Sequence, residues 1–517
     1  MARARATTGS RTHPSARRVA ASAVAVATAL LIGAPAGHAG SPQRARIMSR
    51  LGQLPYSSGV LQAMAVHAGL LPKVGSGPGS PAGGTAPTVL ANVQANPASD
   101  TAPVNEDPIT ADPKTSGTST VLLSGGNDYN CPSSGVSAGF YLSTDDGATF
   151  VRHCFPDVST SLYGCGDPAV GFNLGHTAFI GSILGDCFGT GSGSIYVQKN
   201  PTPSNPGTWT APALAISPPA GGLADKPWLE VDQNSASLHK NRIYISDTQF
   251  DTANGSQIAV AHSNNGTSWT TVNVSSHVAF PTVDQFSDLA IGSDGTVYVS
   301  YMQCVGNGPT GDCGGTSVKF FVQKSTDGGT TWTPAVQVAT AKLAPDSCNA
   351  FYGCVPQTSE RLSDIPVIAV DNSTGPNAGH VYVAYYTFAT TTKLEVATSA
   401  DGGATWGTPV NVRSHNNQVF PWLSVSKAGK LGVSYIGSPN TASPSFDAYA
   451  TTSSDGSTFA GQTKISTASS PWTNDGFGGG FIGDYTGNFW TGRELHACWM
   501  STAGKTVSVD MTGGLST

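Results

Sequence analysis

Charged residues are scarce in this sequence: Asp, Glu, Lys and Arg together make up 11% of its 517 residues. Such sparse charge argues against a protein of long solvent-exposed helices, and no coiled-coil heptads occur. A phosphate-binding loop, a His-Glu-x-x-His motif, a Cys-x-x-Cys pair and a His/Cys cluster with zinc-ligand spacing are also missing. We therefore expect no cofactor. What is abundant is glycine (62) and proline (34), which suits an all-β protein with many tight turns.

Long apolar runs are missing too, except near the N-terminus. Residues 1–40 contain five arginines and no acid, and the apolar stretch Val19–Ile32 is followed by small residues. This pattern predicts a signal peptide over residues 1–40, with a single-pass anchor as the alternative, and hence a secreted, extracellular protein. Without those five positive charges the formal net charge of −6 becomes more negative. We therefore expect no nucleic acid partner and no membrane partner after signal cleavage, and we expect a monomer.

All nine cysteines lie at or after Cys131, and export permits disulfides. Short separations predict four bridges, namely Cys131–Cys154, Cys165–Cys187, Cys304–Cys313 and Cys348–Cys354. Cys498 is left over in an apolar stretch, which favours a buried thiol over a reactive one.

Residues 41–98 differ in character from the rest of the chain. Arg44–Leu71 has apolar spacing compatible with a helix, and Gly75–Thr85 is rich in Gly, Pro and Ser, as linkers are. We expect 41–98 to be a partly helical or disordered segment with a linker, and 99–517 to be the folded domain.

One motif, which we call the Asp box, recurs along 99–517. Its pattern is Ser-x-Asp-x-Gly-x-Thr-Trp/Phe, and the copies, two of them degenerate, begin at Ser143, Ser263, Ser325, Ser399 and Ser453. The pattern predicts a hairpin turn in which Ser and Asp side chains accept hydrogen bonds from turn amides and Gly takes a positive φ. We expect the aromatic residue to pack between sheets, so the role of the box is structural.

A second unit precedes the boxes: an acid, often with Pro, that runs into an apolar strand. Its copies start at Asp107, Asp167, Asp225, Asp284, Asp364, Phe420 and Asp484. Each unit spans roughly 55–80 residues, enough for four strands. The pattern predicts an all-β fold, a β-propeller of four-stranded blades, with seven blades favoured and six as the alternative. The last unit is too short for four strands, so Thr88–Asn96 is expected to supply its missing outer strand.

The Asp boxes resemble those of the sialidase superfamily, also called bacterial neuraminidase repeats, and the resemblance covers roughly residues 100–517. It implies a propeller and, in many members, glycoside hydrolysis. Sialidases bind the substrate carboxylate with three arginines, the first in an Arg-Ile-Pro motif. This sequence has no Arg-Ile-Pro, and no propeller arginine precedes Asp145. The resemblance therefore implies a divergent secreted bacterial member rather than a true sialidase.

The first strand of each propeller blade lines the central axis. The repeated acids Asp107, Asp167, Asp225, Asp284, Asp364 and Asp484, with Glu106, are therefore expected to encircle one mouth of the axis. Paired acids could hydrolyse a glycosidic bond, and a ring of carboxylates could hold a structural Ca²⁺. Alternatively, each Asp only caps its own strand.

Seven other residues of these segments complete the candidate site. Arg361 and Arg493 could bind a substrate anion, and Tyr485 could resemble the tyrosine that sialidases have late in the propeller. Sugar rings stack well on aromatic faces, and the candidates are Trp228, Phe286, Phe420 and Trp472. Packing between blades is the alternative for Trp228 and Trp422.

The leading hypothesis is an exo-acting, sialidase-like glycoside hydrolase that acts on an extracellular glycan or polysaccharide. Its catalytic residues are drawn from Asp167, Asp225, Asp364, Asp484 and Tyr485. The alternatives are a non-catalytic glycan- or protein-binding propeller and a polysaccharide lyase.

Overall fold

The structure is a computed structural model that describes residues 54–57, 60, 61, 64 and 88–517, the last range without 188–189, 206, 220, 253–254, 308–310, 413–416 and 439–442. The predicted signal peptide and the predicted linker lie outside the described residues. Within them, no helix is long and apolar enough to cross a bilayer.

The predicted all-β class is confirmed. The described residues contain thirty-two strands and two short 3-10 helices, η1 (Gly117–Ser119) and η2 (Trp472–Asn474). Val60, Leu61 and Met64, before the first strand, are helical. Within each sheet the pairing is antiparallel, with one exception: β10 and β12 meet in parallel through Gly193 and Leu223.

The strands form seven consecutive antiparallel units. The first has β2 (Val104–Asn105), β3 (Ile109–Ala111), β4 (Leu122–Asp128), β5 (Ser137–Ser143) and β6 (Val151–Cys154). The second has β7 (Tyr163–Gly164), β8 (Ala169–Phe172), β9 (Ala178–Asp186), β10 (Ser192–Asn200) and β11 (Ala213–Ile216). The third has β12 (Leu223–Val231), β13 (Ile243–Phe250), β14 (Gly255–Ser263), β15 (Thr270–Asn273) and β16 (Val278–Ala279). The fourth has β17 (Thr282–Ile291), β18 (Val297–Val305), β19 (Ser317–Ser325) and β20 (Val336–Lys342).

The fifth unit has β21 (Val367–Val370), β22 (Val381–Phe388), β23 (Thr392–Ser399) and β24 (Val410–Asn411). The sixth has β25 (Asn417–Val425), β26 (Leu431–Ser438), β27 (Ser445–Ser453), β28 (Thr463–Lys464) and β29 (Ser470–Pro471). The seventh has β30 (Gly487–Thr491), β31 (Glu494–Ser501) and β32 (Val509–Ser516), and its fourth strand is β1 (Val89–Gln94). The prediction that a segment before the first unit completes the last sheet is thus confirmed by the pairing of Val89 with Leu515.

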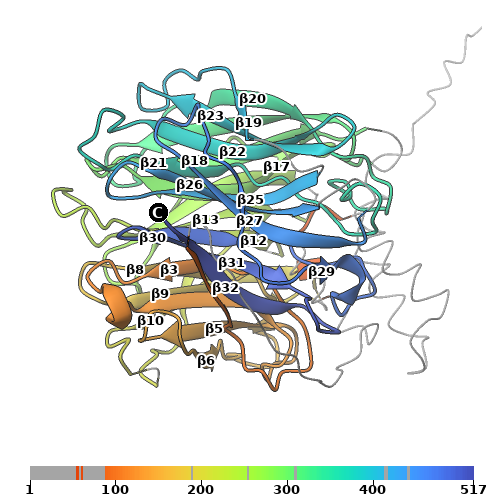
Figure 1. The fold of residues 1–517 in the computed structure, drawn as a ribbon, viewed down its shortest axis with the longest axis horizontal. Coiled ribbons are helices and arrows are strands. Elements are labelled where there is room, and N and C mark those ends of the chain that lie inside the picture. The colour runs from red at the N-terminus through yellow and green to blue at the C-terminus, as the bar shows by residue number, and fades with distance from the viewer. Residues whose placement is uncertain are drawn as a thin grey trace, which may run out of the picture.

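The inner strands of successive units contact one another in a closed cycle. The cycle runs β3, β8, β12, β17, β21, β25, β30 and back to β3. In Figure 1 the units with β5–β10 lie at the bottom of the view and those with β17–β23 at the top, with β12, β25 and β30 between them. Residues far apart in sequence therefore converge at the starts of the inner strands.

The Asp boxes form tight turns with the predicted hydrogen bonds. In the copy at Ser325, the Asp327 carboxylate accepts from the Thr331 amide (2.9 Å) and the Thr331 hydroxyl (2.7 Å), and the Gly329 amide donates to Ser325 Oγ (2.8 Å). Gly329 has φ = 89°, a conformation that favours glycine. The box aromatic Trp332 packs against the main hydrophobic core.

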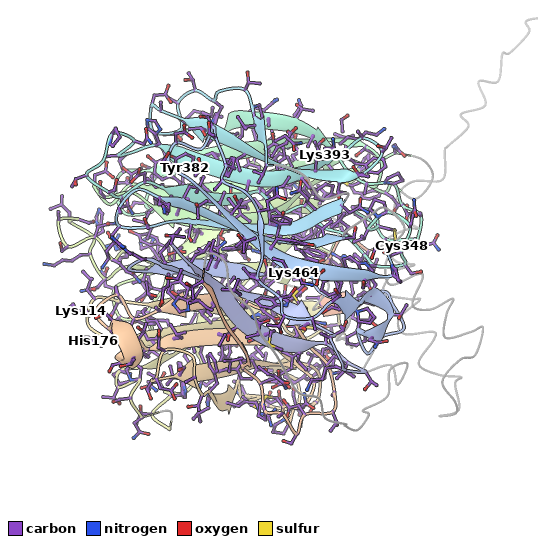
Figure 2. All side chains as sticks on the ribbon, in the orientation of Figure 1. Lys114, His176, Cys348, Tyr382, Lys393 and Lys464 are labelled. Carbon is purple, nitrogen blue, oxygen red and sulfur yellow. A yellow bond between two sulfur atoms is a disulfide. The ribbon has the colours of Figure 1, made fainter. Side chains whose placement is uncertain are left out.

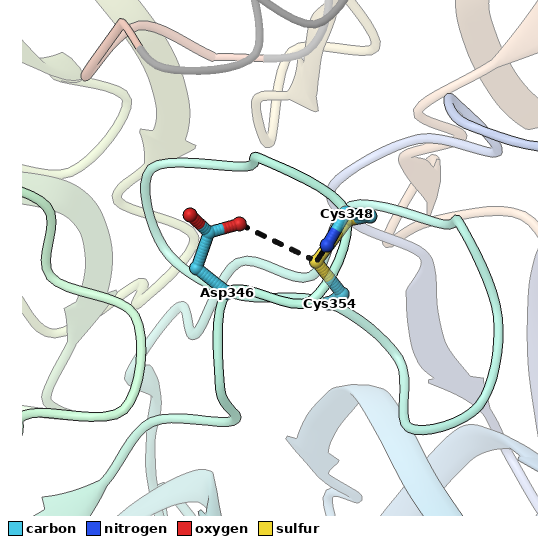
Figure 3. A group of neighbouring side chains, drawn as sticks. All are labelled: Asp346, Cys348 and Cys354. Atoms are coloured by element: carbon cyan, nitrogen blue, oxygen red, sulfur yellow. Dashed lines mark hydrogen bonds between the residues drawn. A yellow bond between two sulfur atoms is a disulfide. The ribbon is translucent and has the colours of Figure 1, made fainter.

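The four predicted disulfides are all present, and Cys498 is a buried free thiol. Each bridge joins segments close in sequence, so each fixes a local hairpin or loop. Figure 3 shows the bridge between Cys348 and Cys354, with the Asp346 carboxylate beside it.

Candidate functional site

The inner strands of several units share a backbone irregularity. Non-glycine residues with positive φ lie just before the strand or in its first half: Glu106 (63°), Asp167 (59°), Lys226 (48°), Phe286 (62°) and Phe420 (51°). Strand pairing shows a bulge there in three units, between Asp225 and Trp228, Gln285 and Asp288, and Val419 and Trp422. Bulges redirect side chains, and strained non-glycine residues often mark functional sites.

The repeated acid does not hold one position relative to this irregularity. Asp167 itself has the positive φ, Asp225 stands one residue before it, and Asp284 two residues before it. A shift of one residue turns a strand side chain to the opposite face. The expected ring of equivalent acids is therefore incomplete. The Asp284 carboxylate accepts from Gln303 Nε2 in the neighbouring strand (2.8 Å).

Asp364, like Asp284, accepts a hydrogen bond from a neighbouring strand of its own sheet. Its carboxylate accepts from the Tyr386 amide of β22 (3.0 Å), inside its own sheet. Burial raises its pKa well above the usual range, and the nearby Glu395 charge adds to the shift. This arrangement is that of a structural acid, and the predicted catalytic role of Asp364 stays a prediction.

The structure does bring five charged residues together at the centre of the cycle, and we call these the central cluster: Glu106, Asp167, Asp225, Arg361 and Asp484. All five are at most 2% exposed. Arg361 Nη2 forms an ion pair with Asp484 Oδ2 (3.2 Å), and Glu106 accepts from the Asp484 amide (3.3 Å).

The other two acids of the central cluster are held by polar groups of the bulges. Asp167 Oδ2 accepts from the Lys226 amide (3.1 Å), and Asp225 Oδ2 accepts from Gln285 Nε2 (2.6 Å). Several polar atoms nevertheless lack a hydrogen-bond partner within the described residues: Asp167 Oδ1, Asp225 Oδ1, and Nε and Nη1 of Arg361. Buried polar groups are normally paired, so these atoms are suited to bind a ligand.

The acids of the central cluster have unusual pKa values because they are buried beside one another. Burial, together with the Asp225 charge, raises the pKa of Asp167 to about 8. Burial raises that of Asp225 to about 6, against the opposing hydrogen bond from Gln285. Burial and the charges of Asp167 and Asp484 raise the pKa of Glu106 well above its usual range. Near neutral pH one carboxyl is thus protonated while its neighbour is ionised.

A buried lysine, not singled out by the sequence, lies beside the central cluster. Lys226 Nζ lies 4.5 Å from the ring centroid of Trp228, 5.0 Å from that of Tyr485 and 5.5 Å from that of Trp422. Burial lowers its pKa to about 8. Lys114, Lys393 and Lys464, labelled in Figure 2, are exposed by contrast. The three rings form an aromatic cage around the Lys226 ammonium group. Two of the rings, Trp228 and Tyr485, belong to residues that the sequence predicted for the site.

Tyr485, one of the three cage residues, is held both through its hydroxyl and through its ring. Its hydroxyl donates to the Pro168 carbonyl (3.0 Å), and its ring lies 5.9 Å from that of Trp228. Burial, together with the negative charges of Glu106 and Asp167, raises its pKa well above 10. The Tyr485 phenol is therefore neutral in this structure.

The remaining predicted substrate-binding residues are spread more widely. Phe286 is buried against Tyr352, with ring centroids 4.7 Å apart, and Phe420 is buried at the start of its unit. Trp472 packs on Phe446, with ring centroids 4.3 Å apart. Arg493 is exposed in the turn between β30 and β31, at the other end of β30 from Asp484. Their predicted roles stay predictions.

Two groups of residues within the described part of the chain have metal-ligand spacing, and neither contains a central acid. One is Asp346 with Cys348 and Cys354, whose sulfurs are already joined in a disulfide (Figure 3). The other is Asp146 with Glu494 and His496, at an outer turn.

One motif not recognised in the sequence is also explained by the structure. Gly135–Gly139 has the spacing Gly-x-Ser-x-Gly, which in some hydrolases exposes a serine nucleophile on a sharp turn. Here Ser137 lies inside β5, is 1% exposed and donates to the Phe155 carbonyl. Ser137 is thus part of a sheet and not of a nucleophile elbow.

No family model and no curated protein matches the chain. Solved structures do resemble it. A Hadza microbial sialidase is 12% identical, with a TM-score of 0.42 and 66% of this chain and 64% of that chain covered. An α-L-arabinofuranosidase from Fusarium graminearum is 12% identical (TM-score 0.45; 71% and 98% covered). An α-L-arabinanase from Penicillium chrysogenum is 14% identical (TM-score 0.42; 83% and 99% covered).

The predicted resemblance is confirmed in this sense: sialidases and arabinan-degrading enzymes are structural neighbours of the chain. A likeness at this identity and TM-score says nothing of the reaction that this chain performs. A function is inferred from the residues of a site and not from the fold alone.

Proposed function

We propose that the seven units are the blades of a seven-bladed propeller and that the protein is a secreted glycoside hydrolase acting on an extracellular glycan. The observation that carries this proposal is the pair Asp167 and Asp225. With pKa values of about 8 and about 6, one is protonated and the other ionised at neutral pH. Glycoside hydrolysis requires one carboxylic acid and one carboxylate at the same site.

In this proposal Asp167 donates its proton to the glycosidic oxygen as the bond from that oxygen to the anomeric carbon breaks. Asp225 supplies the carboxylate, either by taking a proton from the attacking water or by attacking the anomeric carbon itself. In the first route water becomes the hydroxyl on the anomeric carbon, and the proton that Asp225 has taken returns to Asp167 through solvent. In the second route the ionised Asp167 takes a proton from the water that breaks the glycosyl ester of Asp225, which leaves Asp167 protonated and Asp225 ionised again. The free donors of Arg361 are suited to bind substrate oxygens, and Trp228 offers an aromatic face for a sugar ring.

The decisive experiment compares Asp167→Asn, Asp225→Asn and the parent on a panel of arabinans, sialosides, uronate polymers and glucans. We expect each substitution to lower kcat at least ~100-fold. The parent should show a bell-shaped pH profile between about pH 6 and pH 8. Asp327→Asn is the matched control, because Asp327 lies in an outer turn, and it should keep full activity.

The alternative functions give different results in the same experiment. A product that absorbs in the ultraviolet would indicate a lyase, and glycan binding without turnover would indicate a binding propeller. Full activity in folded Asp167→Asn and Asp225→Asn proteins would refute the proposed roles. Because Tyr56 and Ser57, which precede the first strand, contact Arg361 and Asp225, the panel is run both on the intact protein and on a protein cut between residues 75 and 85.

A further inference from the structure

Residues that precede the first strand lie against the central cluster. They are the described residues Leu54–Ser57, Val60, Leu61 and Met64, which we call the N-terminal segment. Ser57, Val60 and Leu61 are 0% exposed, although they stand more than twenty residues before β1. The segment is therefore held by the rest of the molecule.

Most polar contacts of the N-terminal segment are made by its main chain, and the Ser57 side chain adds hydrogen bonds to Asp167 and Asp225. The Ser57 amide donates to Asp225 Oδ2 (2.9 Å), and the Tyr56 carbonyl accepts from Arg361 Nη2 (2.5 Å). The Pro55 carbonyl accepts from the Tyr352 hydroxyl (2.8 Å) and from Gln285 Nε2 (3.2 Å).

One side chain adds an apolar contact, since the Tyr56 ring lies edge-on to that of Phe250 with centroids 5.1 Å apart. The segment bends at residues 54–56 and is helical at Val60, Leu61 and Met64, and its main-chain donor and acceptors match the acids and donors of the central cluster.

These contacts involve the groups that a substrate would use. Asp225 is the proposed carboxylate, and Arg361 is the proposed binder of substrate oxygens. A hydroxyl-rich sugar and a peptide main chain both offer hydrogen-bond donors and acceptors, so both suit the same polar groups. The two ligands would compete for the same atoms.

We infer that the N-terminal segment is an intramolecular inhibitor of the central cluster, and that cutting the chain between this segment and β1 releases it and opens the site. Residues 75–85 are rich in Gly, Pro and Ser, the composition of the predicted linker. Covalent linkage gives a tethered peptide an effective concentration on the order of millimolar. A segment of modest affinity would thus occupy the site before cleavage and leave it after cleavage and dilution. This inference rests on the proposed function in one respect only: that the ligand kept out of the site by the segment is a glycan.

The test uses the full chain with a protease recognition sequence inserted between residues 75 and 85. The cut leaves β1 attached, so the last sheet keeps its fourth strand. The parent chain treated with the same protease is the control, and circular dichroism checks the fold. The probe is a fluorescent synthetic peptide of residues 51–66, followed by fluorescence anisotropy. We expect the cut protein, after gel filtration, to bind it at least 10-fold more tightly than the intact protein.

Two variants of the peptide test how it is held. Ser57→Pro removes the amide that donates to Asp225, and we expect its affinity to fall at least 10-fold. Ser57→Ala keeps that amide and should bind more tightly than the proline variant. Equal binding of the peptide by cut and intact protein, or no binding by a folded cut protein, would overturn the inference.

Turnover separates this inference from the proposed function. If the inference holds, glycan hydrolysis rises at least 10-fold on cleavage and falls again when the free peptide is added. Peptide binding without hydrolysis in the cut protein would support the inference and contradict the hydrolase. Equal hydrolysis by cut and intact protein would support the hydrolase and overturn the inference.

Discussion

The aspartates of the outer turns and those at the centre of the molecule are the same residue type in opposite environments. Asp327 and Asp401 are exposed in Asp boxes, where hydrogen bonds from Thr side chains and amides hold their pKa values well below the usual range. Asp455, in another Asp box, has a pKa of about 2, mainly because its carboxylate accepts a hydrogen bond from the Thr458 amide. At the centre, burial raises the pKa of Asp167 to about 8.

This difference separates residues that stabilise the fold from residues that lower its stability. An aspartate with a lowered pKa is more stable ionised in the folded protein than in the unfolded chain. A buried aspartate with a raised pKa opposes folding wherever it must ionise. Groups of the second kind cluster at functional sites, because catalysis needs protonation states that water would not give. The abundant Asp boxes therefore stabilise the fold, and the less regular central acids are the proposed functional residues.

The largest expected effect comes from breaking the ion pair of the central cluster. Arg361→Met leaves the Asp484 carboxylate buried without its cation, since Arg361 Nη2 is 3.2 Å from it. Removing one partner of a buried pair costs about 3–5 kcal/mol. The free energy of unfolding, measured by urea denaturation at pH 7, should fall by that amount.

An exposed arginine supplies the control for this measurement. Arg493 is exposed in a turn, so Arg493→Met should leave the free energy of unfolding within about 0.5 kcal/mol of the parent. If Arg361→Met changed the free energy of unfolding as little as Arg493→Met does, the central ion pair would not stabilise the fold. Buried and exposed arginines would then not differ in their effect on stability.

A smaller effect of distinctive pH dependence is expected for Asp167→Asn. The pKa of Asp167 is about 8 in the folded protein and about 3.9 in an unfolded chain. Its contribution to stability is therefore full below about pH 4 and is lost as the pH rises through about 8. Asparagine does not ionise, so the variant should match the parent near pH 4 and exceed it by about 1–4 kcal/mol above pH 8. Urea midpoints measured from pH 4 to pH 9 test this.

The same substitution is expected to remove catalysis, so stability and activity should move in opposite directions. If Asp167→Asn were less stable than the parent at pH 8 to 9, the burial of an ionising group there would be refuted. The acid would then be a structural one.

Sequence reasoning succeeded where structure is decided locally. The Asp-box turns depend on residues within a few positions of one another, and the four disulfides join nearby cysteines. The short final unit indicated that a strand from before the first unit must complete the last sheet, because a sheet edge needs a partner.

The central cluster could be predicted only in part, because its composition depends on single-residue register. Asp225 and Asp284 look equivalent in sequence but differ by one position relative to the bulge, and only Asp225 reaches the cluster. Lys226 directly follows Asp225 in the sequence, and no motif marked this lysine as a site residue. The contact of Ser57 with Asp225 spans 168 residues, and no local pattern encodes it.

The smallest effect, with the opposite pH dependence, is expected in an outer turn. The Asp327 carboxylate accepts from the Thr331 amide and hydroxyl, and these bonds lower its pKa below the unfolded value. Its stabilising contribution is present above about pH 4 and disappears as the pH falls through the folded pKa. Asp327→Asn should therefore lower Tm at pH 7 by less than about 2 °C, since the site is exposed. The difference should begin to narrow below about pH 4 and close only as the pH falls through the folded pKa, whereas that of Asp167→Asn closes near pH 4 and grows toward alkaline pH. Calorimetric scans of both variants at pH 3, 5, 7 and 9 test the contrast, and differences of the same sign in both variants at pH 7 to 9 would show that the two classes of aspartate are not distinct.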